Sequence, residues 1–377
     1  MPGSTDNKIR PRVSVAMPVH NAGRANLQVS IGSVLAQTMP QIELICVDDA
    51  STDCSAKALD EFASRDPRVH VISFPYNRGT LDARTAAIIA STGDYVVPLD
   101  PDDHLDADAC RRLCKAMDDS DWTMAQFGMR LFAENGNRTD AKKREEFEHW
   151  FSPHVRSECS FTSFAHDTFI GRSRCWTMAA KIFKREALVS ALRTMPQGYC
   201  VNGEDGLALL AFLESGDGRV GVLTDKLYNY RWGYGISTTA SFNEARMSGM
   251  IRSAIFANRF LESRDSECAN AYRRLLMKNM VSDIVYRCRP AVMRRTAVTS
   301  LAKGVSRPAL ECAFHDLGIS HRFFNRCGLV FRTALARTLD RRRKLRRRLA
   351  LARRIASLEK TARRSQRSNN QSKDGAT

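Results

Sequence analysis

The sequence predicts an α/β fold, with a mostly parallel sheet flanked by helices, followed by an all-α extension. Within 13–105, short apolar runs alternate with segments of helical periodicity, which is the pattern of β-α-β units with right-handed crossovers. From about residue 243 onward, apolar residues recur only at helical spacing. Polar and acidic residues follow several of the apolar runs. In a parallel sheet they would collect at one edge, outside the carboxyl ends of the strands, where ligands bind.

Four apolar runs are predicted to be buried parallel strands, because they are short, nearly free of charge and end in polar residues. These runs are 13–21, 42–47, 69–72 and 95–99. Helices between them are predicted from apolar residues at three- and four-residue spacing, after turns rich in N-cap residues. The helical segments are 27–35, a stretch around 58–62, and 81–90.

The second part of the domain is expected to continue with mixed elements as far as residue 240. One or two strands are predicted over 122–132, followed by a charged surface insertion over 133–160. The remaining predictions are a strand over 175–183, a helix over 185–192, a helix opening within 199–205, and two short strands at 220–223 and 227–230. A helical extension is predicted over 241–330.

Composition limits the class of protein. A chain of 377 residues with 43% hydrophobic residues is long enough for one large domain and an appended region. No uncharged apolar run reaches the ~18 residues of a membrane-spanning helix. The segment 1–12 is polar, is predicted to be flexible and has no apolar signal-peptide core, so we expect a cytoplasmic protein. The eleven cysteines are scattered, which predicts reduced thiols and no disulfide framework.

The net charge of +17 is concentrated near the C-terminus. Between residues 332 and 367, fifteen Lys and Arg residues stand against two acids, which accounts for thirteen of the seventeen net positive charges. Apolar residues at helical spacing predict a basic amphipathic helix over 331–364, and the polar segment 365–377 is predicted to be disordered. The basic helix has three interpretations: it binds an anionic membrane surface, it binds nucleic acid, or it is a solvated or oligomerisation arm.

The acidic stretch after the fourth predicted strand is the first candidate site. Asp100, Asp102 and Asp103 fall within four residues, and such close carboxylates repel one another unless a cation lies between them. Carboxylate oxygens suit hard divalent ions, and Mg²⁺ is usually held by one or two carboxylates together with substrate phosphates. The alternative is an acidic turn before a helix, with Asp106 as the N-cap.

Polar residues after the first two predicted strands join this edge. His20 and Asn21 follow the first strand, and Asp48 and Asp49 end the second. Together with the acidic stretch they predict a nucleotide site with a metal at its rim. The chain has no Gly-rich phosphate loop of the dinucleotide or Walker type, so a metal and side chains are expected to neutralise the phosphates.

The order of several short motifs resembles the GT-A family 2 glycosyltransferases, the large inverting family. The similarity spans 13–235, and residues 243–377 carry no recognised motif of that family. The similar segments are Val-Ser-Val-Ala-Met-Pro-Val-His-Asn at 13–21, Ser-Val-Leu-Ala-Gln-Thr at 33–38, Glu-Leu-Ile-Cys-Val-Asp-Asp-Ala-Ser-Thr-Asp at 43–53, Asn77 with Gly79 and Arg84, Gly-Asp-Tyr at 93–95, Trp176 with Lys-Ile-Phe-Lys-Arg at 181–185, and Gly-Glu-Asp at 203–205.

The resemblance implies a GT-A domain over 13–240, with a nucleotide-binding half at about 13–132 and an acceptor half at about 133–240. It implies that Asp49 accepts from the nucleobase, that Pro18, Val19 and His20 line the base, and that Arg84 approaches the uracil or the phosphates. Asp100 and Asp102 would form the Asp-x-Asp pair that binds Mn²⁺ or Mg²⁺, with Asp102 as the more direct ligand.

The same resemblance makes Asp205 the catalytic base and Glu204 a supporting residue. Asp205 would take the proton of an acceptor hydroxyl, and such general-base help is worth roughly 10²–10⁴-fold. From its position alone, Asp205 is equally an early-helix acid that the helix dipole favours. On the acceptor side, Trp176 is either an acceptor contact or core packing, and Arg231 either contacts an anionic group or is solvated.

Three departures from the family pattern concern the nucleotide side. His20 replaces the aromatic residue that commonly follows the first strand, Ala50 replaces a glycine, and Pro101 is an unusual middle residue of the acidic motif, where it fixes φ. None removes a group that the chemistry needs, but they leave the base specificity open.

The resemblance implies an enzyme that takes a sugar from a nucleotide sugar, with a UDP-sugar favoured, and passes it to a glycan or lipid-linked acceptor in bacterial polysaccharide or cell-envelope synthesis. With such an acceptor, we expect the basic helix to hold the protein peripherally on the inner face of the membrane. We favour this role over binding of nucleic acid. Formation of an oligomer by this protein is left open. One alternative is a sugar-phosphate nucleotidyltransferase, which usually has a Gly-rich basic loop after its first strand; residues 18–26 have one glycine and one arginine. The other is an inactive glycan- or nucleic-acid-binding module.

Overall fold

The first apolar run forms β1, Val13–Val19, a fully buried strand inside a mixed sheet. The computed structural model describes residues 10–132, 145, 147–149, 151–232 and 244–286. Among these residues the sheet has nine strands, in the order β3-β2-β1-β4-β8-β6-β9-β5, with β7 paired to β9. The basic helix predicted over 331–364, the tail 365–377 and most of the predicted N-terminal segment 1–12 lie outside the described residues.

The sheet is parallel where the sequence alternates strand and helix. β1 pairs in parallel with β2 and β4, and β2 pairs in parallel with β3. Beyond β4 the sheet becomes mixed, because β8 is antiparallel to both β4 and β6, whereas β6 and β9 are parallel. The other strands are β2 Ile42–Asp48, β3 Val69–Ser73, β4 Tyr95–Pro98, β5 His104–Leu105, β6 Met124–Phe132, β7 Ser157–Ser160, β8 Lys181–Lys184 and β9 Arg219–Arg231.

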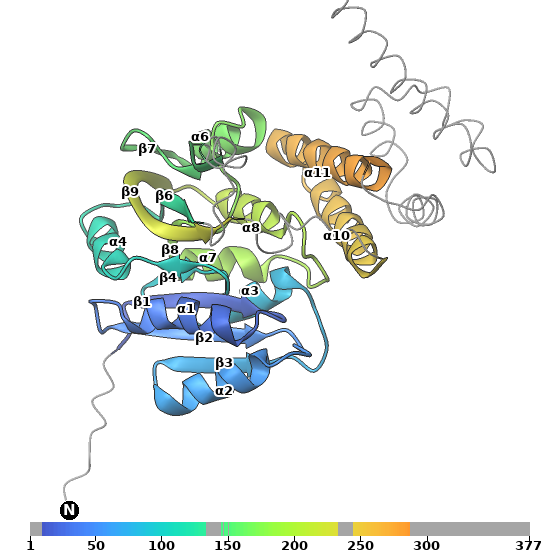
Figure 1. Ribbon diagram of the computed structural model, residues 1–377. Coiled ribbons are helices and arrows are strands. Elements are labelled where there is room, and N and C mark those ends of the chain that lie inside the picture. Colours follow the sequence, from blue (N-terminus) through green and yellow to red (C-terminus); the bar gives the residue numbers. More distant parts are fainter. Residues whose placement is uncertain (1–9, 133–144, 146, 150, 233–243, 287–377) are drawn as a thin grey trace, which may run out of the picture. The chain divides into compact units, whose positions relative to one another are not determined.

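Helices cover both faces of the sheet and create two apolar cores. Successive residues of a strand point to opposite faces; thus Val15 and Met17 belong to one core and Ala16 to the other. The first core is covered by α1, α2 and α4, and the second by α3, α7 and α8 (Figure 1). The bounds are α1 Arg24–Leu35, α2 Ser55–Arg65, α3 Thr80–Ala90, α4 Ala109–Asp118, α6 Phe161–Ala165, a π-helical turn at His166–Ile170, α7 Arg185–Arg193 and α8 Glu204–Leu213.

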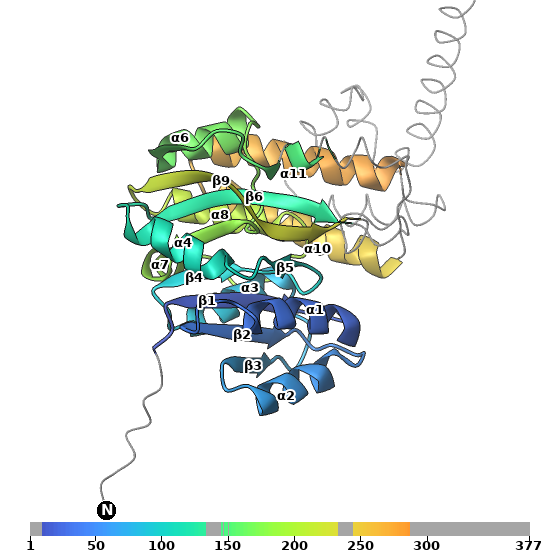
Figure 2. The same cartoon turned by 60° about the vertical axis from the view of Figure 1, so that its left-hand side comes forward.

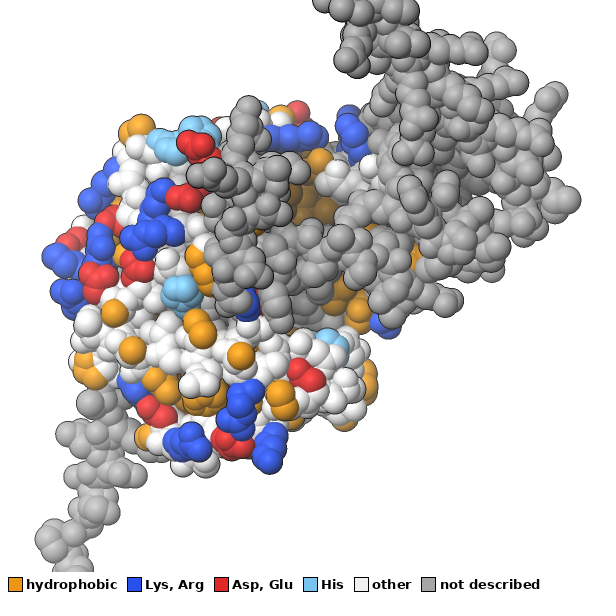
Figure 3. All heavy atoms as spheres, in the orientation of Figure 1, with side chains coloured by type: hydrophobic (Ala, Val, Ile, Leu, Met, Phe, Trp, Pro, Cys, Tyr) orange, Lys and Arg blue, Asp and Glu red, His pale blue; other side chains and the backbone are white. Residues whose placement is uncertain are grey.

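The helical extension begins as predicted, with α10, Glu244–Glu262, and α11, Glu267–Tyr286. Both contact α8, on the face of the sheet opposite α1 and α2 (Figure 2). None of the described helices combines the length and apolar character needed to cross a bilayer. On the face shown in Figure 3, cationic and anionic side chains of the described residues are interspersed and do not form a patch of one sign.

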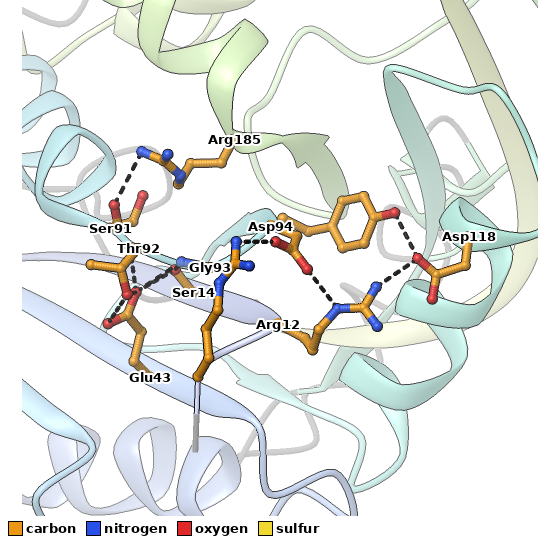
Figure 4. A network of polar contacts seen from close by, with 11 residues as sticks. Arg12, Ser14, Glu43, Ser91, Thr92, Gly93, Asp94, Asp118 and Arg185 are labelled. Carbon is orange, nitrogen blue, oxygen red and sulfur yellow. Dashed lines mark hydrogen bonds and ion pairs between the residues drawn. The ribbon is translucent and has the colours of Figure 1, made fainter. Parts of the chain in front are cut away.

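A polar network fixes the beginning of β4 against β1 and β2 (Figure 4). Glu43 is buried and accepts hydrogen bonds from the Ser14 hydroxyl at 2.6 Å and the Thr92 backbone N–H at 2.6 Å. Gly93 is required for the close approach, because a Cβ there would lie 2.8 Å from Ser14 Oγ. The network sets the strand register at the end of the sheet opposite the polar rim.

Two predicted strands differ from the structure. Residues 175–180 do not continue β8, because the Lys181 ammonium donates to the carbonyl groups of Cys175 and Thr177 and Ala180 adopts a φ of 53°. The two short strands predicted at 220–223 and 227–230 are one strand, β9, which pairs with β6 across register shifts. The charged insertion is partly structured, since its last residues form β7.

Candidate active site

The carboxyl ends of β1, β2 and β4 bring the predicted nucleotide residues to one rim. His20, Asp49 and Asp100 follow three adjacent parallel strands. The His20 Nδ1 lies 2.8 Å from the Asp49 carbonyl oxygen. Pro18 and Val19 are buried within β1, so that His20 is the solvent-exposed member of the predicted base-lining segment.

Asp49 organises the loop that follows β3. Its buried carboxylate accepts hydrogen bonds from the backbone N–H groups of Arg78 at 2.6 Å and Gly79 at 2.8 Å. Gly79 has a φ of 90°, and a Cβ at this position would lie 2.9 Å from the Cys200 nitrogen. The carboxylate therefore holds the N-terminus of α3 close to the segment that precedes α8. The predicted contact of Asp49 with a nucleobase stays a prediction.

Arg84 links the two acidic parts of the site. Its Nη2 donates to Asp100 Oδ1 at 2.8 Å and its Nη1 to Asp205 Oδ1 at 2.6 Å, while Glu204 Oε1 lies 3.8 Å from Nη1. The Arg84 side chain is 5% exposed. Burial alone would lower the pKa of Arg84, but the charges of Asp205, Asp100 and Glu204 raise it above its ordinary value. Arg84 is therefore a permanent cation among three carboxyl groups.

Asp205 lies in the first turn of α8 and has contacts at both carboxylate oxygens. Thr177 Oγ1 donates to Asp205 Oδ2 at 2.7 Å, opposite the contact with Arg84. Burial and the neighbouring charge of Asp205 raise the pKa of Glu204 well above that of an ordinary glutamate. An ionised carboxylate has about four acceptor positions, so these two contacts leave Asp205 able to accept a further hydrogen bond.

The three carboxyl groups of the acidic stretch, those of Asp100, Asp102 and Asp103, have different environments. Asp103 is buried and accepts from the Tyr228 hydroxyl at 2.7 Å and the Arg231 backbone N–H at 2.8 Å. It therefore fastens the acidic loop to β9. Burial, followed by the charge of Asp100, raises the pKa of Asp102 to about 6.

The alternative of Asp106 as a helix N-cap is wrong. α4 begins at Ala109, after Asp108. The Asp106 carboxylate instead accepts hydrogen bonds from Arg130 and Asn229.

The donor set at the acidic loop fits a hard divalent cation. Burial and, after it, the charge of Asp100 raise the pKa of Asp102, and a cation between the two carboxylates would relieve their repulsion. No group of three or more His, Cys, Asp or Glu residues is arranged to hold a metal in the described part of the chain. Mg²⁺ usually needs only one or two protein carboxylates, with phosphates and water completing its ligands. Asp102, with Asp100 beside it, would hold the ion.

The two predicted acceptor-side residues lie at opposite ends of the site. Trp176 is half-buried, precedes Thr177, and its ring centroid lies 6.1 Å from that of Tyr272. Arg231 ends β9, hydrogen-bonds to Asn26 of α1, and its charge acts on Asp102. The contact of Arg231 with an anionic ligand stays a prediction.

Sequence reasoning missed three contributors. Thr177 contacts Asp205, Lys181 holds the carbonyl groups of Cys175 and Thr177, and Tyr228 holds Asp103. Lys181 is 1% exposed, and burial lowers its pKa. The sequence did contain a signal for Lys181, because it belongs to the same family-like motif as Trp176. Thr177 and Tyr228 carry no such signal, because their roles depend on distant partners.

Comparison with known proteins shows which family and which fold the chain resembles. The model of the glycosyl transferase family 2 matches residues 14–178. This segment of the chain is therefore similar to the family 2 glycosyltransferases. The GT-A fold is also that of TarS 1-349 from S. aureus, solved in complex with UDP-GlcNAc, with a TM-score of 0.54, 15% identity, and coverage of 82% of this chain and 88% of TarS.

Several curated relatives are named as glycosyltransferases. One is TuaG of Bacillus subtilis (strain 168), a candidate glycosyltransferase of teichuronic acid biosynthesis, with 34% identity over 131 residues, 35% of this chain and 52% of TuaG. Another is an N-acetylglucosaminyltransferase of Rhizobium meliloti (strain 1021), with 31% identity over 184 residues, 48% of this chain and 41% of the relative. The chain thus spans about half, or less, of the length of these two relatives. The family 2 match ends before Asp205, so that the second half of the site lies outside it.

Proposed function

We propose that this protein transfers a sugar from a nucleoside-diphosphate sugar to a hydroxyl group of a glycan or lipid-linked acceptor, with inversion at the anomeric carbon. The observation that carries the proposal is the bridge from Asp100 through Arg84 to Asp205. In this bridge, the Arg84 guanidinium contacts two carboxylates. Asp100 lies on the proposed side of the diphosphate, and Asp205 is the proposed proton acceptor. The transfer needs both functions at the same anomeric carbon.

In the proposed reaction, the acceptor oxygen forms a bond to the anomeric carbon while the bond from that carbon to the diphosphate oxygen breaks. Asp205 accepts the hydroxyl proton, and the electron pair of the broken bond leaves with the nucleoside diphosphate. A single displacement of this kind inverts the configuration. Thr177 and Arg84 each hold one oxygen of Asp205, which restricts the rotation of the carboxylate and keeps it oriented toward the acceptor.

The negative charge that develops on the leaving group requires compensation. A divalent metal, Mn²⁺ or Mg²⁺, held at Asp102 with Asp100, would act as a Lewis acid on the diphosphate. Arg231 contributes a fixed positive charge on the same side, since its charge already acts on Asp102. The side chains of His20 and Asn77 lie 3.2 Å apart at the exposed rim and would contact the nucleotide base.

UDP-GlcNAc is the first donor to test. TarS, which has the same fold, was solved with this nucleotide sugar, and the Rhizobium relative is named an N-acetylglucosaminyltransferase. Purified protein incubated with a panel of UDP- and GDP-sugars and Mn²⁺ should hydrolyse or transfer at least one of them. Release of UDP or GDP measures the reaction, and the mass of the product identifies the sugar. Absence of binding and of turnover with every donor would contradict the proposal.

The acceptor is proposed to be a membrane-associated glycan in polysaccharide synthesis; the relative TuaG is named for teichuronic acid biosynthesis. The basic segment 332–367, which lies outside the described residues, would then hold the protein at an anionic bilayer. Each nearby cation adds about 1 kcal/mol of attraction to such a surface. Deletion of 332–377 should release the protein from vesicles that contain anionic lipid. Unchanged sedimentation with these vesicles would contradict the membrane role.

A further inference from the structure

The helical extension contacts the part of α8 that carries the proposed catalytic base. α11 lies against α8 and against the π-helical turn His166–Ile170. In Figures 1 and 2, α11 lies on the same side of the sheet as α8. α11 lies outside the segment matched by the family model, which ends at residue 178. The contact is therefore a feature of this chain beyond its family segment.

Tyr272 of α11 makes the central contact. Its side chain is fully buried, and its hydroxyl donates to the Gly203 carbonyl oxygen at 2.9 Å. Gly203 immediately precedes Glu204 and Asp205 and has a φ of 81°, in the left-handed region. The hydrogen bond therefore fixes the peptide at which the chain turns into α8.

Two glycines allow α11 to approach this turn. A Cβ at Gly206 would overlap the Tyr272 phenol, and a Cβ at Gly203 would lie 2.6 Å from Leu276 Cδ2. The first turn of α8 is thus packed directly on α11, with no room for a side chain between them. A shift of Tyr272 would be passed to Asp205 because well-packed interiors transmit strain.

The aromatic ring of Tyr272 also contacts the second segment that holds Asp205. Its centroid lies 5.0 Å from that of Phe169 and 6.1 Å from that of Trp176. Trp176 precedes Thr177, whose hydroxyl donates to Asp205 Oδ2. One buried side chain therefore supports both the turn that carries Asp205 and the segment that donates a hydrogen bond to it.

We propose that Tyr272 is a positioning residue for Asp205 and that the helical extension α10–α11 is part of the catalytic unit. The proposal rests on the proposed function of Asp205 as the base. Tyr272 touches neither donor nor acceptor in this proposal. Its contribution is the orientation of Asp205, which affects the chemical step and leaves binding of the nucleotide unchanged.

The test is Tyr272→Phe, which removes only the hydroxyl group. The matched control is Tyr95→Phe: Tyr95 is also buried, and its hydroxyl donates to Asp118 at 2.8 Å, at the far end of β4. Turnover is normalised to the number of UDP-binding sites measured by calorimetry, so that a loss of folded protein is not counted as a loss of catalysis. We expect kcat per site to fall about 3- to 10-fold in Y272F, the worth of one hydrogen bond, with KM for the donor within about 2-fold of wild type and kcat of Y95F unchanged.

Hydrogen–deuterium exchange gives a measurement that does not depend on activity. The amides of 203–207 should exchange faster in Y272F than in wild type and Y95F. Wild-type kcat per site in Y272F, or equal losses in Y272F and Y95F, would overturn the proposal, as would unchanged exchange in 203–207. If wild-type protein turns over no donor, the proposed function fails, and the exchange measurement still decides whether Tyr272 holds this segment.

Discussion

The Arg84 guanidinium lies 2.6 Å from the Asp205 carboxylate, although 121 positions separate the two residues in the chain. The same guanidinium holds Asp100, at the end of β4. An isolated buried charge is costly, and it is tolerated when it is paired and hydrogen-bonded. The positive charge of Arg84 therefore allows Asp100, at the end of β4, and Asp205, at the start of α8, to lie close together.

Asp205→Asn tests the role of the proposed base. The amide keeps an oxygen that can accept from Arg84, but it cannot take up a proton from the acceptor. We expect kcat to fall by roughly 10²–10⁴-fold, while the Kd for UDP measured by calorimetry stays close to that of wild type. Loss of nucleotide binding and of turnover to the same degree would instead make Asp205 a structural residue.

Asp102→Asn tests the metal site without using activity. In wild-type protein, Mn²⁺ with UDP should raise Tm, because a ligand present at 100 times its Kd stabilises the folded state by about 2.7 kcal/mol. In D102N the shift in Tm caused by Mn²⁺ should be largely lost. Asp121→Asn, at an exposed position near β6, is the control and should keep the shift. An undiminished shift in D102N would exclude Asp102 as a ligand.

Glu204→Gln tests how much the acidic side chains around Arg84 reduce the free energy of unfolding. Burial and Asp205 raise the pKa of Glu204 in the folded protein, so the folded state binds a proton that the unfolded state releases. The contribution of this bound proton to the stability of the folded state is fully present below the unfolded pKa of about 4.3. It is lost as the pH rises toward the pKa of Glu204 in the folded protein. The free energy of unfolding of wild type should therefore fall between about pH 5 and pH 8 by an amount of order 1–3 kcal/mol.

In E204Q that part of the pH dependence should be absent, because the amide does not titrate. Denaturant unfolding at pH 5, 6.5 and 8 measures the difference between the two proteins. The gain in stability from E204Q should be larger at pH 8 than at pH 5. A gain that is independent of pH would mean that Glu204 binds the same number of protons in the folded and unfolded states, and a gain that is larger at pH 5 would contradict a raised pKa of Glu204.

The parallel half of the sheet was predictable because its information is local. Each buried strand is a short apolar run, and the helices between them show their own periodicity, so that Val13–Val19 and Thr80–Ala90 match predicted elements closely. The continuous strand β9 was not predictable, because Asp225 and Lys226 interrupt its apolar run while pairing with β6 keeps it extended. Tertiary pairing overrode the local pattern at this point.

The candidate site was predictable as a set of residues but not as a set of contacts. Asp100, Asp102 and Asp205 were identified from motifs, whereas the position of Arg84 between Asp100 and Asp205 depends on how α3 packs against α8. The same reason hides Tyr272, which reaches Gly203 from a helix without a family motif. The left-handed conformation of Ala50 was indicated by the sequence, because the family pattern has a glycine at this position.

Ala50→Gly tests that last point. Ala50 has a φ of 55°, and a left-handed conformation costs a residue with a Cβ about 1–2 kcal/mol, part of which is offset by the greater freedom of glycine in the unfolded chain. We expect A50G to stabilise the protein by about 0.5–1 kcal/mol, measured as a higher denaturant midpoint with an unchanged slope. Ala116→Gly, within the regular helix α4, is the matched control and should lower stability by about 1 kcal/mol. Equal destabilisation by both substitutions would show that Ala50 is not strained and that the loop between β2 and α2 gains nothing from glycine.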